Sequence, residues 1–402
     1  METKEETEQK KVFYRVIIAT GIIVVAFNLR PSITSVGPLI GTIRDHLGLS
    51  NWSAGMLTSL PLIAFAVMSP LVTKLSNRFT NERVMLLGLF GLFIGITLRS
   101  MAIISLLFVG TLLIGLGIAI CNVLLPSVIK EKFPMKVALM TSIYSTAMGI
   151  SAATASGLSV PIAEGLHFGW QIALIVWAIP ALLGIIVWIY LRKQLTDHYR
   201  VLYQPIIEQK QIWRSPLAWQ VAAFMGFQSF LFYVTISWMP EILQAYGISA
   251  SAAGWMLSFL QFIGLPASFI VPVLAGQYRS QHGIVLAMGL FSIIGYTGLL
   301  LGKSNIVMVV SIILIGFSLS GTFALALTLL GMRARNGKQA AQLSGMAQSV
   351  GYVLAAIGPF LVGYLYDKTQ TWDIPLLTLI SVAIIVVVFG FGAGRDKYVF
   401  DE

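Results

Sequence analysis

Arg30 is the one charged residue that lies deep inside a long apolar stretch of this chain. A charge in the interior of a bilayer is costly, so a residue of this kind usually faces a cavity or a partner. Arginine stays protonated at any accessible pH and presents its donors in a planar fork, which suits a small anion. We therefore expect Arg30 to bind a solute. The alternative is that it reaches the membrane surface or ties helices together through backbone carbonyls.

Pro31 follows Arg30 directly and predicts a kink in the same span. Proline lacks a backbone N–H, and its ring clashes with the carbonyl four residues earlier. Asn28 lies two residues before Arg30 and is a further candidate for solute binding. In a regular helix these two side chains point well apart, so only a local distortion would bring both to one cavity.

Neutral polar side chains inside other apolar stretches are the remaining candidates for solute binding: Asn122, Tyr144, Gln228, Tyr233, Gln261 and Gln348. Gln348 shares a helix face with Tyr352, four residues later. A buried amide needs partners for its oxygen and its nitrogen, and a neighbouring helix supplies them as readily as a solute does. Hydrogen bonding between helices is therefore the alternative for each of these residues.

Apolar stretches long enough to cross a bilayer fill almost the whole chain. A hydrocarbon core of about 30 Å needs roughly 20 residues of helix, because every backbone polar group must be satisfied internally. The mean hydropathy of +0.86 is typical of such a protein. The sequence predicts an all-α polytopic membrane protein with twelve transmembrane helices, at about 13–36, 52–74, 83–101, 103–130, 137–163, 169–191, 216–241, 251–275, 283–302, 305–331, 340–366 and 373–394.

Most of the 26 Lys and Arg residues fall in alternate segments between these spans. Translocation disfavours basic residues in short external loops, so the side that carries the excess is the cytoplasmic one. This indicates that both termini are cytoplasmic and that the protein lies in the plasma membrane of a bacterium-like cell. The net charge of +10 follows from the same bias, so we expect no nucleic-acid partner.

The chain also contains an internal repeat. The motif Gly48-Leu49-Ser50 recurs as Gly247-Ile248-Ser249, and a pattern of small residues that begins at Lys136 recurs from Lys338. Close helix packing alone is the alternative explanation for shared small residues, but agreement in two places favours duplication. We expect two pseudo-symmetric six-helix halves. The predicted segments are a cytoplasmic N-terminal tail (1–12), an N-terminal half (13–191), a cytoplasmic central loop (192–215), a C-terminal half (216–394) and a cytoplasmic C-terminal tail (395–402).

This parallel repeat resembles the major facilitator superfamily. The segment 70–83 is similar to the superfamily's loop between the second and third spans, with Arg78 and Arg83 in place but Asn77 for Asp and Thr80 for Gly. The resemblance implies a solute site near the midplane, between halves that rock to give alternating access, with spans 1, 4, 5, 7, 8 and 11 lining the cavity. It also implies a cytoplasmic latch at Arg78 and Arg83, for which Glu131 is the acidic candidate.

Within the superfamily, the chain resembles the cyanate and 2-nitroimidazole porter family. The motifs that carry this likeness are Asn28-Leu29-Arg30-Pro31 with Gly37-Pro38-Leu39, Leu125-Pro126 through Lys130 with Phe133-Pro134, Tyr144-Ser145, Gln228-Ser229, Phe232-Tyr233 and Trp238-Met239-Pro240. The likeness implies a secondary active transporter of a small polar or anionic solute, such as cyanate or a related compound. Efflux of neutral or amphipathic drugs such as nitroimidazoles is the alternative, because Met, Phe and Trp residues in the spans offer an adaptable apolar wall.

Carboxylates and histidines are absent from the predicted span interiors, and Glu131 and Glu241 are the carboxylates nearest to the membrane. If protons are the coupling ion, the proton either travels on a weak-acid solute or titrates Glu131. A structural ion pair is the alternative role of Glu131. The direction of transport stays open.

Other function classes are disfavoured by what the sequence lacks. The single cysteine, Cys121, excludes an intrachain disulfide and leaves no metal-ligand cluster. There is no nucleotide-binding loop and no catalytic motif. We therefore expect no cofactor, no bound metal, no enzymatic activity and no obligate protein partner beyond the solute and the lipid bilayer. A membrane-embedded sensor or enzyme is a minor alternative.

Overall fold

The structure is a computed structural model that describes residues 4–49, 51–196, 212–302 and 304–400. Within these ranges, 12 helical segments are long and apolar enough to cross a membrane. This confirms the predicted all-α polytopic fold and the number of spans. Individual ends differ from the predicted ones by a few residues, as in the eighth span, Met256–Gln277, where the sequence predicts 251–275.

The N-terminal half contains α1 (Lys4–Asn28), α2 (Pro31–Thr34), α3 (Ile40–Leu47), α4 (Asn51–Arg78), α5 (Asn81–Arg99), α6 (Ile104–Lys132), α7 (Val137–Val160), α8 (Gly169–Ile175) and α9 (Ala178–Thr196). The first span is divided between α1 and α2, and the sixth between α8 and α9. Glycines let α5 and α6 touch backbone to backbone: a Cβ on Gly95 would stand 2.7 Å from the carbonyl oxygen of Gly110. Such close approach is a common way for helices to pack in membranes.

The C-terminal half contains α11 (Pro216–Ala245), α12 (Ala250–Gln277), α13 (His282–Leu301), α14 (Asn305–Met332), α15 (Gly337–Thr369) and α16 (Asp373–Ala393). Within it, α11 packs on α15 and α16, and α14 packs on α12 and α13. The predicted central loop, 192–215, falls largely outside the described residues. The helix α1 begins at Lys4, inside the segment predicted as a tail.

The first span breaks where Pro31 predicts a kink. The helix α1 ends at Asn28, and α2 starts at Pro31 with Arg30 as its N-cap residue. The backbone N–H groups of Ile33 and Thr34 both bond to the carbonyl oxygen of Arg30, at 2.9 and 3.0 Å. The break therefore places Arg30 at a helix start inside the span rather than on a continuous helix.

The repeated glycine motif occupies equivalent turns in the two halves. Gly48 follows α3 with a φ of 63°, and Gly247 follows α11 with a φ of 89°. Both values lie in the left-handed region that favours glycine and ends helices. Ser249, after the second glycine, caps α12 by accepting a hydrogen bond from the N–H of Ala252. The repeat found in the sequence thus corresponds to a repeated local structure.

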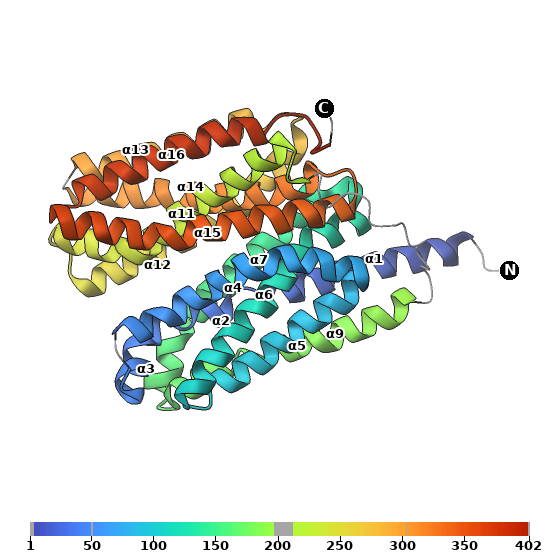
Figure 1. Cartoon of the computed structure of the whole chain (residues 1–402), viewed down its shortest axis with the longest axis horizontal. Helices are drawn as coiled ribbons and strands as arrows, with labels where there is room; N and C mark the ends of the chain where they lie inside the picture. Colours follow the sequence, from blue (N-terminus) through green and yellow to red (C-terminus); the bar gives the residue numbers. More distant parts are fainter. Residues whose placement is uncertain (1–3, 50, 197–211, 303, 401–402) are drawn as a thin grey trace.

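Both chain ends lie at one end of the bundle, which we call the termini end; the other is the far end. Figure 1 shows two bundles that converge toward the termini end and spread apart toward the far end. The helices α4, α6 and α7 contact α12, α14 and α15 across this boundary. Near the termini end, the hydroxyl of Ser127 donates to the carbonyl oxygen of Gly337 at 2.7 Å, and that of Ser142 donates to Phe269 at 2.6 Å.

The segment after α16 folds back on the loop between α14 and α15. The N–H of Val399 donates to the carbonyl oxygen of Arg333 at 3.0 Å. The Arg333 guanidinium donates to the carbonyl oxygen of Ala393 at 3.0 Å and to the side chain of Gln281. Burial lowers the pKa of Arg333 to about 10. Arg333 is therefore charged at neutral pH and ties α14 to the end of α16.

Candidate functional site

Arg30 lies half-buried in the break of the first span and reaches across to the other half of the molecule. Its guanidinium carbon stands 4.8 Å from the ring centroid of Phe323 on α14 and 5.4 Å from that of Phe232 on α11. A cation over an aromatic face contributes about 0.5–2 kcal/mol, depending on how dry the site is. The contact therefore joins a charge of the N-terminal half to two rings of the C-terminal half.

Tyrosines extend this site on both sides of the boundary. Tyr233 on α11 and Tyr352 on α15 interact electrostatically with Arg30. Tyr144 on α7 lies near Tyr352. The ring of Tyr352 also packs on that of Phe65 on α4, with 4.7 Å between centroids. The structure thus brings together three residues singled out from the sequence, Arg30, Tyr144 and Tyr233.

Three buried oxygens near this boundary have no hydrogen-bond partner in the described structure: Tyr144 Oη, Gln228 Oε1 and Gln348 Oε1. The amide nitrogens of the two glutamines are occupied. Gln228 donates to the hydroxyl of Ser229 at 2.7 Å, and Gln348 donates to that of Ser344 at 2.8 Å. A buried polar group left unpaired costs about 1–3 kcal/mol. These oxygens are therefore acceptors that a solute N–H or O–H group would satisfy.

Helix geometry places the two amide oxygens next to the aromatic residues. Gln228 precedes Phe232 by four residues on α11, and Gln348 precedes Tyr352 by four residues on α15. Residues four apart on a helix lie on the same face, about 5–6 Å apart at Cβ. Both acceptors therefore lie one helical turn from side chains that contact or interact with Arg30.

Among the described residues, no acidic side chain forms an ion pair with Arg30. The ion pairs found among the described residues lie elsewhere, between Arg44 and Asp45 and among Lys132, Glu82 and Glu131. No group of His, Cys, Asp and Glu side chains in the described ranges is arranged to hold a metal. The site therefore combines one fixed cation, flat aromatic walls and acceptor oxygens.

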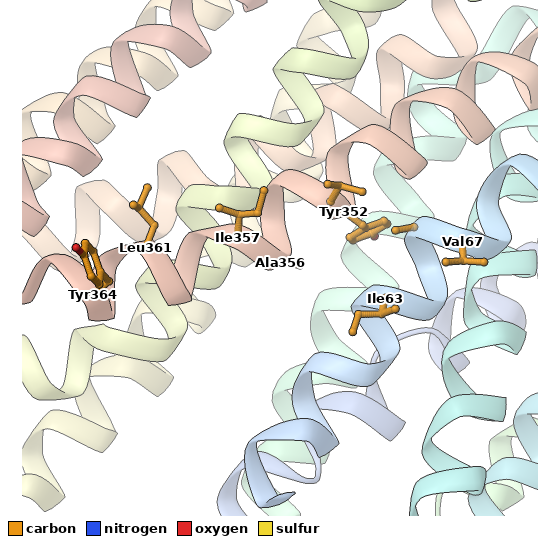
Figure 2. Close-up of a pocket in the computed structure, with 9 residues that line it drawn as sticks. Ile63, Val67, Tyr352, Ala356, Ile357, Leu361 and Tyr364 are labelled. Atoms are coloured by element: carbon orange, nitrogen blue, oxygen red, sulfur yellow. The ribbon is translucent and has the colours of Figure 1, made fainter. Parts of the chain in front are cut away.

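An apolar cavity of about 680 Å³ lies beside the site, between α4 and α15. Figure 2 shows Ile63 on α4 across from Ile357 on α15, with Tyr352 and Val67 near the point where the two helices approach. Tyr352 thus belongs both to the wall of this cavity and to the cluster around Arg30. The helices α4 and α15 diverge toward the far end of the bundle (Figure 1).

Asn28 is turned away from Arg30, toward its own half. Its amide nitrogen donates to the carbonyl oxygens of Val24 at 2.7 Å and of Pro180 on α9 at 3.0 Å. The side chain is only 3% exposed. The break at Pro31 does not bring both residues to one cavity, and Asn28 joins α1 to α9 instead.

Asn122 and Gln261 are both half-buried, on α6 and α12 respectively. Within the described ranges, no hydrogen bond joins either side chain to the cluster around Arg30. Their proposed contact with a solute stays a prediction.

The residues predicted to form a latch lie at the termini end but are not paired as expected. Glu131 accepts a hydrogen bond from Asn81 at 3.3 Å and pairs with Lys132 at 2.6 Å. Arg83 is exposed, and the guanidinium of Arg78, also exposed, lies 5.8 Å from the ring centroid of the adjacent Phe79. Glu131 therefore has the structural ion pair that was its alternative role, and a gating function of these residues stays a prediction.

Sequence reasoning missed several residues of the site. Phe232 and Phe323 resemble any lipid-facing phenylalanine in the sequence, although Phe232 belongs to a motif that carries the family likeness. Tyr352 stood out only as a helix-face neighbour of Gln348. Arg99, at the end of α5, is only 2% exposed. Arg30 is therefore not the only arginine held in the interior.

Two six-helix halves that meet around a shared polar site define a polytopic membrane transporter. The model of the Major Facilitator Superfamily matches residues 18–359. The chain belongs to this superfamily and is a transporter of small solutes rather than an enzyme.

Curated relatives confirm the predicted branch of the superfamily. The chain is 50% identical over 385 residues to the uncharacterized transporter YycB of Bacillus subtilis (strain 168), covering 96% of this chain and 95% of the relative. It is 40% identical over 384 residues to the 2-nitroimidazole transporter of Escherichia coli (strain K12), covering 95% and 96%. It is 24% identical over 378 residues to the cyanate transport protein CynX of the same organism, covering 92% and 96%.

Solved structures support the fold. The Major Facilitator Superfamily transporter FucP, crystallised in the outward conformation, superposes with a TM-score of 0.74 at 11% identity, covering 95% of this chain and 100% of FucP. At this identity the likeness concerns the arrangement of helices.

Proposed function

We propose that the protein is a secondary carrier of a small planar solute that bears an acceptor group, such as a nitro group, and a hydrogen-bond donor. The acceptor group binds Arg30, and the flat part of the solute lies against Phe232 and Phe323. The donor bonds to one of the two unpaired amide oxygens, that of Gln228 or that of Gln348. Tyr144, Tyr233 and Tyr352 complete the polar wall.

The observation that carries this proposal is the uncompensated charge of Arg30 between two aromatic rings. A guanidinium offers parallel N–H groups that match a planar acceptor such as a carboxylate, and a nitro group has the same planar pair of oxygens. Ring faces favour a flat molecule over a bulky one. A nitro-substituted heteroaromatic ring with an N–H group satisfies the cation, the rings and one of the acceptor oxygens together. The 40% identical relative named as a 2-nitroimidazole transporter supports this solute class.

A small inorganic anion such as cyanate is the second candidate. The absence of an acidic neighbour at Arg30 favours it, and a relative is named as a cyanate transport protein. Such an anion neutralises the guanidinium but has no donor for the oxygens of Gln228 and Gln348. This difference makes the heteroaromatic compound the better fit.

We propose that the protein lies in the plasma membrane with both termini cytoplasmic, because basic residues concentrate on that side. The termini end is then the cytoplasmic end, and the state described here is closed toward the cytoplasm. Rocking of the two halves about Arg30 would expose the site to each side in turn. The side chains proposed to bind the solute include no carboxylate or histidine, so a coupled proton would travel on the solute or involve groups elsewhere, such as Glu131.

The experiment is solute flux into proteoliposomes, with labelled 2-nitroimidazole and labelled cyanate, with and without an imposed pH gradient. We expect saturable flux of 2-nitroimidazole that is lost in Arg30→Gln. Arg335→Gln is the matched control, because Arg335 lies at the termini end against Tyr398. Saturable flux of cyanate alone would select the second candidate. Equal flux in wild type and Arg30→Gln would exclude both.

A further inference from the structure

Arg99 is a second buried cation, and its surroundings differ from those of Arg30. It ends α5 at the far end of the N-terminal half and is only 2% exposed. Its Nη1 donates to the carbonyl oxygen of Ser32, in the short helix α2 directly after the break. This bond supplies a donor to a carbonyl that the broken span leaves without a helical partner. One nitrogen of the guanidinium is thus accounted for.

The other two nitrogens of Arg99, Nε and Nη2, have no acceptor in the described structure although both are buried. These two atoms lie on one edge of the guanidinium and direct their N–H groups in parallel. This edge is the one that chelates carboxylate and other oxyanions in bidentate pairs. The unpaired donors are therefore arranged for a single small anion rather than scattered around the group.

No charged side chain compensates Arg99 from within the described ranges. The ion pairs there involve Arg44 and Lys132 instead. The helix α6 packs closely on the backbone of Arg99, because a Cβ on Gly110 would stand 2.6 Å from the backbone nitrogen of Arg99. A charge removed from water in this way is strongly unfavourable unless a counter-charge accompanies it.

Further unpaired donors lie on the segments around this end of α5. The indole nitrogen of Trp170 on α8 and the hydroxyl of Ser35, at the end of α2, are buried without a partner. The helix α8 contacts α5, and α2 contacts it through Ser32 and Arg99. This part of the N-terminal half therefore holds unpaired donors and no described carboxylate pairs with them.

We propose that the Nε and Nη2 edge of Arg99 binds a small inorganic anion, of the size of chloride or nitrate, inside the N-terminal half. This site is separate from the one at Arg30 and does not depend on which solute is transported. The bound anion neutralises Arg99 and so stabilises the contact that holds α2 beside α5.

The test is thermal unfolding of the purified protein during a chloride titration. Chloride replaces gluconate so that the ionic strength stays constant, and gluconate is too large to enter an enclosed site. The variants are Arg99→Lys, which keeps the charge but loses the parallel donors, and Arg30→Gln as the control. Binding to the folded state alone raises the melting temperature in a saturable way. We expect a rise on the order of 2 °C or more in wild type and in Arg30→Gln, and an apparent chloride affinity at least about tenfold weaker in Arg99→Lys.

Three results would overturn the proposal. A wild-type melting temperature that does not respond to chloride would mean that water meets the unpaired donors. An unchanged titration in Arg99→Lys would place the anion elsewhere. Loss of the response in Arg30→Gln would assign it to the central site. If Arg99→Lys does not fold, the decisive experiment is anomalous diffraction from wild-type crystals grown in bromide. The proposal requires a bromide peak beside Arg99, and the absence of that peak contradicts it.

Discussion

The guanidinium carbon of Arg30 lies 4.8 Å from the ring centroid of Phe323, across the boundary between the two halves of the protein. The arginine is fixed in a helix break of the first span, and the ring is carried by α14. A solute bound to Arg30, as we propose, would therefore touch both halves at once. Since a ligand shifts an equilibrium only through contacts that differ between the states, this pair connects solute binding to the motion of the halves.

Phe323→Leu is expected to raise the KM for a planar solute by about 2- to 10-fold, because an aromatic pair contributes about 0.5–1.5 kcal/mol beyond its buried area. The measurement is the concentration dependence of flux. Phe317→Leu is the control, since Phe317 is a half-buried ring on the same helix that packs on Phe291. Equal changes in the two variants would show that the ring of Phe323 acts only through packing.

Tyr352→Phe removes a hydroxyl but keeps the ring contact with Phe65. We expect the KM to rise by about 2- to 10-fold, because a hydrogen bond contributes about 0.5–1.5 kcal/mol to binding. We expect no change in the melting temperature. Tyr296→Phe provides the comparison, because the hydroxyl of Tyr296 bonds to Thr235 at 2.6 Å inside the C-terminal half. That variant should lower the melting temperature and leave the KM unchanged. The opposite pattern would remove Tyr352 from the site.

Asn28→Leu tests whether Asn28 is a solute ligand or a structural residue. Its amide bonds to Pro180 on α9, so the substitution leaves that buried carbonyl without its side-chain donor. We expect a loss of about 1–2 kcal/mol in stability, seen as a lower melting temperature, with the KM of the folded protein unchanged. A raised KM at normal stability would restore the role in solute binding that the sequence suggested.

Gly337→Ala is expected to destabilise the state that is closed at the termini end. A Cβ on Gly337 would stand 2.9 Å from the carbonyl oxygen of Ser127 and 3.2 Å from the Cβ of Glu131. The backbones of α6 and α15 would have to separate there, which favours the alternative state of the carrier.

Spin labels at Lys136 and Lys338, two exposed positions at the termini end, report this opening. Cys121 is buried, and replacing it with alanine leaves the labels specific. We expect longer distances between the labels in Gly337→Ala than in the parent protein. Gly157→Ala is the matched control, because a Cβ on Gly157 meets nothing within 4 Å. An unchanged distance distribution in Gly337→Ala would show that Ser127 and Gly337 do not limit the opening.

The fold follows from local features of the sequence. Apolar length gives the number of spans, Pro31 predicts the break that positions Arg30, and the repeated glycines at 48 and 247 occupy matching left-handed turns. Each of these features depends on backbone chemistry within a few residues, so a single sequence contains enough information to predict it.

The site follows only in part, because its members come together through long-range packing. Arg30, Tyr144 and Tyr233 are recognisable as polar groups inside apolar spans. Phe323 is not, since nothing local distinguishes a ring that covers a cation from one that faces lipid. The burial of Arg99 is likewise not predictable from the local sequence. Neighbouring helices decide whether a residue at the end of a span is buried or exposed.

Equilibrium binding of labelled 2-nitroimidazole to the purified protein, wild type against Arg30→Gln, tests the central claim most directly. Hydrogen bonds to a charged group contribute about 1.5–3 kcal/mol, so we predict a Kd about 10- to 150-fold higher in the variant. The same Kd in both proteins would contradict the account, because the solute would then bind without the charge on which the proposed site is built.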